Sequence, residues 1–159
     1  MNHEMFCFQC EQTAGCIGCT GKMGVCGKKS ATAEIQDRVT GALIGLARAT
    51  FGNEDVVNDH TAALVIEGLF ATLTNVNFDD DRLLALIDRI AEEKKRLVPE
   101  CSRCVTMCGR NDNYDMRELW NADEDIRSLK ALILFGIRGM AAYAYHAAVL
   151  GYKDERIHT

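Results

Sequence analysis

The chain has 159 residues, of which 48% are hydrophobic and 26% are charged, and its formal net charge is -5. These values are typical of a soluble globular domain and exclude a disordered tail or a fibrous protein. The negative charge argues against a nucleic-acid partner held through phosphate contacts. The first ten residues lack a basic stretch followed by an apolar one, and no uninterrupted run of eighteen apolar residues occurs. We therefore expect neither a signal peptide nor a membrane span.

Eight cysteines and a single proline stand out against this background. Five cysteines fall within the first 26 residues and three between positions 101 and 108, whereas residues 27–100 contain none. A disulfide scaffold would need anchors in that middle stretch, and clustered thiols in a cytoplasmic protein are typical of metal or redox sites. The composition therefore predicts a cytoplasmic protein with a metal centre.

Residues 1–30 are rich in glycine and cysteine and show no helical or strand periodicity, which predicts a Cys-rich loop. Three amphipathic segments follow, each with apolar residues that recur every three or four positions. The predicted helices cover residues 33–51, 59–74 and 80–97. Their expected N-caps are Thr32, Asn58 or Asp59, and Asp79, because such side chains accept hydrogen bonds from free backbone N–H groups. The pattern predicts a three-helix bundle over residues 31–98.

After Pro99, residues 99–122 are polar and irregular and are predicted to form a Cys-containing connection. A fourth helix is predicted over residues 124–150, capped by Asp123, and it is apolar on nearly every face. A helix of this kind is either buried on all sides or covered by a partner. If the chain folds alone, we expect a homodimer through residues 126–150.

The first and fourth predicted helices share a pattern, which indicates either an internal repeat or a chance alignment of two amphipathic helices. A shift of 91 positions places Ile35 on Ile126 and Leu43 on Leu134, so the apolar stripe of one helix recurs in the other. The predicted fold is therefore all-α, with residues 123–159 beginning a second, incomplete bundle.

The first cysteine group lies in the stretch MFCFQCEQTAGCIGCTGKMGVCGK. Cys7 and Cys10 form a Cys-x2-Cys pair, Cys19 follows after eight residues and Cys26 after six more. Four thiolates are the ligand set of an iron–sulfur cluster or of a structural zinc ion. Cys16 and Cys19 form a second Cys-x2-Cys pair, so the spacing leaves open a zinc site that uses Cys16 in place of Cys26.

Three lysines accompany these cysteines: Lys22, Lys28 and Lys29. Positive charge and backbone N–H groups close to the sulfurs would favour the reduced, more negative form of a cluster.

The segments FCFQCEQTA and GCTGKMGVCGK resemble the N-terminus of the hybrid cluster protein family, also called hydroxylamine reductase. The segments LFATLTNVNFDDDR and SLKALILFGIRGMAAYAYHAAVLGYKDE are similar to that family's N-terminal helical domain, so the resemblance covers nearly the whole chain. It implies a helical domain of two related three-helix bundles and an iron–sulfur cluster near the N-terminus. Matched residue by residue, the implied ligands are Cys7, Cys10, Cys19 and Cys26, with Cys16 as a possible substitute.

The resemblance also bears on the type of cluster. The eight-residue gap between Cys10 and Cys19 is that of the family's [4Fe–4S] class, whereas the six-residue gap between Cys19 and Cys26 is that of its [2Fe–2S] class. The first of these gaps governs how far the loop reaches, so we expect [4Fe–4S], with [2Fe–2S] or zinc as alternatives.

The family's reaction takes place at a second, mixed cluster held by later domains that this chain lacks. The resemblance therefore implies part of an oxidoreductase that binds a cluster and passes electrons without reducing hydroxylamine by itself. The chain would be a fragment, a split subunit or a shortened relative. Its expected partners are a redox protein or the missing catalytic domains, with no nucleic acid and no membrane.

The second cysteine group, Cys101, Cys104 and Cys108, has the spacing i, i+3, i+7 and would share one face of a helix. These residues are either ligands of a second metal site or reduced thiols. Two further interpretations of the chain stay open. One is a zinc-stabilised helical interaction module, and the other is a thiol redox protein that uses Cys7 and Cys10.

Overall fold

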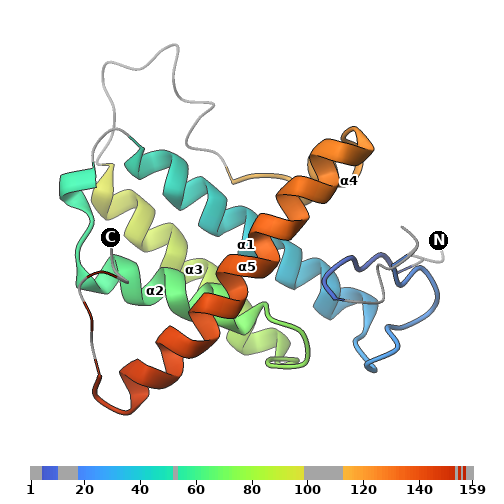
Figure 1. The fold of residues 1–159 in the computed structure, drawn as a ribbon, viewed down its shortest axis with the longest axis horizontal. Coiled ribbons are helices and arrows are strands. Elements are labelled where there is room, and N and C mark those ends of the chain that lie inside the picture. Colours follow the sequence, from blue (N-terminus) through green and yellow to red (C-terminus); the bar gives the residue numbers. More distant parts are fainter. Residues whose placement is uncertain are drawn as a thin grey trace.

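The computed structural model describes residues 5–10, 18–51, 54–98 and 113–152, together with Asp154 and Arg156. Helices dominate this part of the chain, and its only extended pairing consists of two isolated bridges in the N-terminal loop (Figure 1). The predicted all-α fold is confirmed.

The helices, in chain order, are α1 (Ser30–Thr50), α2 (Asp59–Ala71), α3 (Asp80–Leu97), α4 (Met116–Trp120) and α5 (Glu124–Val149), with a 3-10 turn, η2 (Glu54–Val56), before α2. The four predicted helices are all present, and their ends differ from the prediction by about three residues or fewer, as is usual for fraying ends. The sequence did not predict α4, because five residues are too short to show a helical period.

The N-caps agree with the prediction at three helices and disagree at one. The side chains of Asn58, Asp79 and Asp123 each accept hydrogen bonds from backbone N–H groups in the first turns of α2, α3 and α5. The assignment of Thr32 as the cap of α1 is wrong, because α1 begins earlier and buries Thr32 in its first turn. Lys29 precedes α1 without a side-chain cap, and its pairing with Met23 fixes where the helix starts.

Helices α1, α2 and α3 share one hydrophobic core. Its centre is formed by fully or nearly fully buried side chains: Val39, Leu43, Leu46, Leu64, Leu83, Leu86 and Ile90. Helix α3 runs beside α1, and α2 packs against both (Figure 1). Each side chain of this size contributes about 1.5–3 kcal/mol on burial, so this core holds the three helices together.

The short helix α4 rests on α1. The backbone N–H of Tyr114 donates to the carbonyl oxygen of Gly41 at 3.0 Å, and a Cβ at position 41 would overlap the Tyr114 carbonyl oxygen. Glycine is therefore required for this close approach. Met116 and Leu119 of α4 are buried, so tertiary contacts stabilise a helix that propensity alone would not.

Helix α5 lies across α2. The rings of Phe70 on α2 and Tyr145 on α5 stack with their centroids 4.6 Å apart. Within α5 only Ala131, Arg138 and Ala141 are buried. The helix leaves a row of large apolar side chains in solvent: Ile126, Leu129, Leu132, Ile133, Ile137, Met140 and Tyr143. We call these seven residues the outer face of α5.

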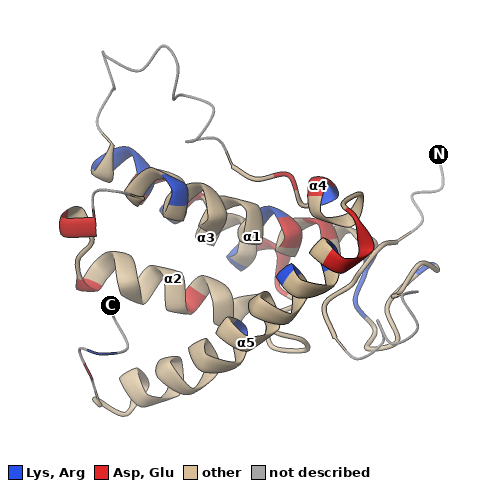
Figure 2. Ribbon diagram, turned by 45° about the horizontal axis from the view of Figure 1, so that its top comes forward, with Lys and Arg blue, Asp and Glu red and all other residues tan. Residues whose placement is uncertain are grey.

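By length and composition, α5 could also cross a membrane, and it is the single such helix in the described residues. The sequence-based test required an unbroken apolar run, so it did not find this segment. Figure 2 shows that the charged residues of α5 lie toward its N-terminal half. The last of them, Arg138, is only 2% exposed and faces the protein.

Candidate metal centre

Two of the predicted ligands face each other in the N-terminal loop. Cys7 and Cys19 form an isolated antiparallel bridge, with N–H···O distances of 3.0 Å from Cys7 to Cys19 and 2.9 Å in the reverse direction. Residues directly opposite each other in such a pair point their side chains to the same face. The backbone therefore places these two thiols side by side.

A glycine makes this pairing possible. Gly18 has a φ of +63°, and a Cβ at this position would lie 2.8 Å from the carbonyl oxygen of Cys7. A side chain here would suffer both backbone strain and a collision. Gly18 thus turns the chain so that Cys19 meets Cys7.

The fourth predicted ligand lies in a second, tighter turn. The N–H of Gly24 donates to the Lys28 carbonyl at 2.8 Å, and the N–H of Gly27 donates to the Gly24 carbonyl at 2.9 Å. Cys26 lies within this turn and is exposed, whereas Lys28 at its end is buried. The turn brings Cys26 and Lys28 to the same cavity that Cys7 and Cys19 line.

All four implied ligands line a single cavity of about 170 Å³. Cys7 is buried, Cys10 and Cys19 are half-buried, and Cys26 is exposed. The described lining of this cavity includes no carboxylate or histidine. Besides the cysteines, the cavity is lined by Met5, Gln9, Gly24, Val25, Lys28, Thr74 and Asn75. Thiols are therefore the strong metal ligands in the described lining, and four of them are the ligand set of an iron–sulfur cluster or of a structural zinc ion.

These thiols are free and surround the cavity without converging on a point. Across the described ranges, no three His, Cys, Asp or Glu side chains are grouped closely enough to hold a metal ion. Cys16, and with it the zinc alternative, lies outside the described residues. The same holds for the second predicted site at Cys101, Cys104 and Cys108.

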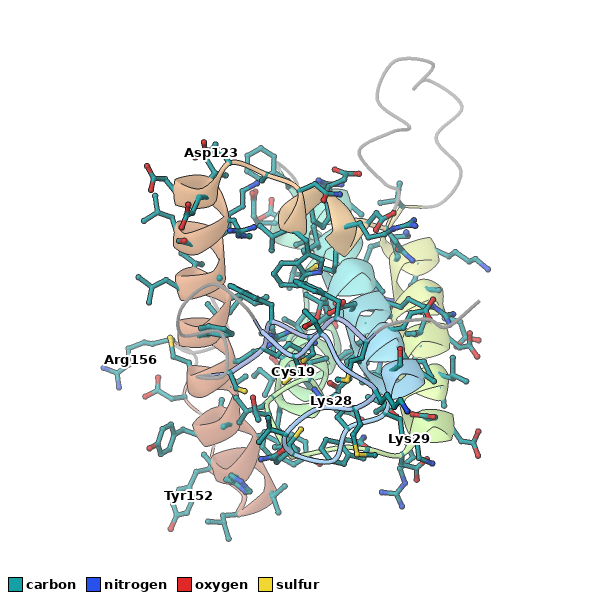
Figure 3. The ribbon with its side chains drawn as sticks, turned by 90° about the vertical axis from the view of Figure 1, so that its right-hand side faces the viewer. Cys19, Lys28, Lys29, Asp123, Tyr152 and Arg156 are labelled. Carbon is teal, nitrogen blue, oxygen red and sulfur yellow. The ribbon has the colours of Figure 1, made fainter. Side chains whose placement is uncertain are left out.

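A buried lysine approaches the most buried cysteine. The Lys28 ammonium donates to Cys7 Sγ at 3.8 Å and to Gln9 Oε1 at 3.0 Å. Burial raises the pKa of the Cys7 thiol, and the positive charge of Lys28 and a backbone N–H of Gln9 lower it. Figure 3 shows Lys28 and Cys19 together in the loop in front of α1, with Lys29 farther out. Of the three lysines that the sequence indicated, Lys22 and Lys29 are exposed.

Gln9 connects Lys28 to α1. Its side-chain N–H donates to Asp37 Oδ1 at 3.0 Å, and its carbonyl accepts from Thr74 Oγ1 at 2.9 Å. Burial raises the pKa of the Asp37 carboxyl to about 6, against the opposing effects of the Gln9 hydrogen bond and the Arg138 and Lys28 charges. A basic and an acidic group are thus joined through one buried amide.

Arg138 brings a second buried cation to this region from α5. Its guanidinium donates to Thr40 Oγ1 at 2.8 Å and to Thr72 Oγ1 at 3.1 Å. Burial lowers its pKa to about 10, and the charges of Asp37 and Cys7 partly offset this effect. Buried cations need nearby negative charge, and the single carboxyl of Asp37 stands beside the two cations Arg138 and Lys28. A further anionic group on the cysteines would balance the second cation.

Three aromatic rings pack around the extended segment that carries Cys7. Phe6 and Phe8 flank Cys7 in sequence, and both rings lie 5.4 Å from the ring of Trp120 between centroids. Because side chains alternate along an extended chain, these rings lie on the face opposite the Cys7 thiol. Helix α4 thereby anchors the loop through Trp120, for which the sequence had indicated no role.

Sequence reasoning missed Gln9, Asp37 and Arg138 as parts of this site. Asp37 reads in the sequence as an acid near a helix N-terminus, and Gln9 carries no distinguishing pattern. Arg138 did leave a signal, because it is the single charged residue in the stretch LILFGIRGMAAYAYHAAVLG. A lone charge in an apolar helix indicates a buried partner.

Comparison with known proteins identifies the class to which this fold and loop belong. Residues 5–159 match the model of the Prismane/CO dehydrogenase family. The chain is 37% identical to a hydroxylamine reductase of Maridesulfovibrio salexigens, an alignment that covers 97% of this chain and 31% of the relative. It is 40% identical to one of Syntrophobacter fumaroxidans, covering 97% and 32%. A third, from Porphyromonas gingivalis, is 39% identical, covering 99% and 32%.

The chain therefore belongs to the Prismane/CO dehydrogenase family, which confirms the resemblance inferred from the cysteine motif. It spans about a third of the length of these hydroxylamine reductases.

Proposed function

We propose that this chain is an iron–sulfur-binding electron-transfer domain, equivalent to the N-terminal helical domain of hydroxylamine reductases. The proposed ligands are Cys7, Cys10, Cys19 and Cys26, and the proposed group is [4Fe–4S]. When bound, such a group takes up and releases single electrons. We place the protein in the cytoplasm, where cysteines stay reduced and available as ligands.

The observation that carries this proposal is the cavity lined by all four cysteines without a carboxylate. A thiol set around a volume of about 170 Å³ suits a polynuclear group better than a single zinc ion, which draws its ligands to one point. The buried charge of Lys28 supports an anionic occupant. The buried side chain of Met5 supplies an apolar wall on the inner side of the cavity, next to Cys7.

The relatives are named hydroxylamine reductases, and this chain spans about a third of their length. We propose that the reduction of hydroxylamine needs the remaining part of such a protein, and that this domain supplies electrons to it. The chain alone should then show no hydroxylamine reduction above that of the electron donor by itself.

We also propose that the outer face of α5 binds protein, namely the catalytic part of such an enzyme, and neither lipid nor nucleic acid. Arg138 turns the polar side of α5 toward α1 and α2, and the apolar stripe that α1 buries in its own core recurs on α5. A stripe of this pattern is typical of helix-to-helix contact.

Anaerobic reconstitution of the full chain with iron and sulfide tests the cluster. We expect bound iron and acid-labile sulfide in equal amounts and broad absorption near ~400 nm, as for clusters held by thiolates. Cys10→Ser should lose most of the bound iron, because it removes one of four ligands. Thr20→Ala is the matched control, since Thr20 is an exposed residue of the same loop and should leave the iron content unchanged.

Two results would reject the proposal. Bound zinc without sulfide or colour would favour the zinc-stabilised module, and a Cys7–Cys10 disulfide that forms reversibly without any metal would favour a thiol redox protein.

A further inference from the structure

Lys28 is buried to a degree that is rare for its residue type. It is only 1% exposed, whereas Lys22 and Lys29 of the same loop lie in solvent. Lysine is almost never fully buried unless its charge is paired. The structure therefore raises the question of which negative group balances this ammonium.

The contacts of Lys28 point to the cysteines. Its ammonium lies 3.8 Å from Cys7 Sγ and 3.0 Å from Gln9 Oε1, and the ring of Phe78 lies 5.9 Å away. The Gln9 oxygen is neutral, and the carboxylate of Asp37 is linked to Lys28 through Gln9 without a direct ion pair. Among the direct contacts of Lys28, Cys7 is therefore the one that becomes an anion when it binds a metal.

Gln9 fixes the place of the ammonium. Its amide N–H is held by Asp37 at 3.0 Å and its backbone carbonyl by Thr74 at 2.9 Å, so the amide oxygen can point only toward Lys28. The side chain of Lys28 loses its freedom for this arrangement, which is a cost that a purely structural residue could avoid. An apolar side chain would fill the same space without burying a charge.

Resting on the function proposed above, we propose that Lys28 is a positioning residue that donates a hydrogen bond to the Cys7 sulfur and raises the reduction potential of the cysteine-held cluster. A fixed positive charge and an N–H···S hydrogen bond both stabilise the more negative, reduced state. Gln9 is the group that keeps the ammonium in place.

The test uses the full chain, reconstituted anaerobically, with iron and sulfide measured before any potential. Lys28→Met removes the charge while keeping the length, Lys28→Arg keeps the charge, and Lys29→Met is the matched control in solvent. We expect a lower midpoint potential for Lys28→Met than for the wild type in a dye-mediated titration. The other two variants should stay close to the wild-type value.

Each outcome separates this proposal from the one on which it rests. A wild-type chain that takes up no iron and sulfide overturns the proposed function itself. A loaded Lys28→Met chain with the wild-type potential overturns the role of Lys28 alone, as does a Lys28→Arg potential as low as that of Lys28→Met.

If Lys28→Met fails to load, loading of Lys28→Arg at the wild-type potential supports a requirement for positive charge at this position. Failure of both variants, with Lys29→Met loading normally, overturns the proposal because shape and not charge would then be the requirement.

Discussion

At the scale of single residues, the chain places ionisable groups of both signs close to its cysteines. Lys28 and Arg138 are buried cations, and Asp37 is the carboxyl that both of them influence. Because Asp37 is half-buried and burial raises its pKa, the proton on Asp37 changes the free energy of the fold more than that of a surface carboxyl would. Asp37 therefore connects pH to the stability of this region.

Asp37→Asn should change how stability depends on pH. The pKa of Asp37 is raised in the fold from 3.8 to about 6, so the folded state holds the proton more tightly than the unfolded state does. The contribution of Asp37 to the free energy of unfolding is then most favourable below about pH 4, falls as the pH rises to about 6, and stays low above that. The total fall is at most about 3 kcal/mol. In Asp37→Asn this fall should be absent.

Urea unfolding of both proteins between pH 4 and pH 8 measures the effect. The difference in unfolding free energy between Asp37→Asn and the wild type should grow in favour of the variant over that range. A difference that stays constant with pH would contradict the prediction.

At the scale of helices, a buried carboxylate joins α2 to α3. Glu93 of α3 accepts a hydrogen bond from Thr61 of α2 and two from Arg96, at 2.7 and 2.8 Å. The Arg96 and Thr61 hydrogen bonds lower the pKa of Glu93 to about 2. The first turn of α2 is thus tied to the C-terminal end of α3.

Glu93→Gln should destabilise the chain by about 1–3 kcal/mol at pH 7, because it removes the charge that Arg96 and Thr61 bind. Glu67→Gln is the control: Glu67 also makes two hydrogen bonds to an arginine, Arg89, at 2.7 and 2.8 Å, but on the exposed surface. That variant should cost no more than about 1 kcal/mol.

The pH dependence gives a second readout for the same pair. Because the pKa of Glu93 is depressed, its contribution is complete above its ordinary pKa of 4.5 and is lost as the pH falls toward 2. Wild type and Glu93→Gln should therefore converge in stability under acid. If Glu67→Gln costs as much as Glu93→Gln at pH 7, burial is not the source of the effect.

At the scale of the whole molecule, the outer face of α5 is the largest feature that the fold leaves open. Tyr143 is 83% exposed, and Leu132 and Met140 are exposed by two thirds. A groove of about 270 Å³ beside this face, between α1, α4 and α5, is also lined mainly by apolar side chains. Exposed apolar surface of this extent marks an interaction site.

We expect the isolated chain to cover this face with a second copy of itself. Ile133→Glu should shift sedimentation from a concentration-dependent dimer toward monomer, because a charge at the centre of the face opposes contact. Ser128→Glu adds the same charge at an exposed polar position of α5 and should leave the dimer intact. A wild-type chain that sediments as a monomer at every concentration would refute self-association.

The helices were predictable to the extent that their signals are local. Asn58, Asp79 and Asp123 are caps whose partners lie within a turn, and the apolar periods of α2 and α3 reflect the faces that these helices bury. Helix α4 was not predictable, because the contact that supports it joins Gly41 to Tyr114, far apart in the chain. The start of α1 was misplaced because a tight loop bridge between Met23 and Lys29, which has no helical or strand period, precedes it.

The candidate site likewise has parts that the sequence indicates and parts that only tertiary packing brings together. The sequence by itself indicated thiol ligands, and its resemblance to the family gave Cys7, Cys10, Cys19 and Cys26 as the candidate set. Only the tertiary structure decided which charges face those thiols. Lys28 and Asp37 are close in sequence, whereas Arg138 comes from α5, and the packing of α5 against the rest of the fold brings the three charges into one site. Burial depends on how helices pack, so no local pattern could predict it.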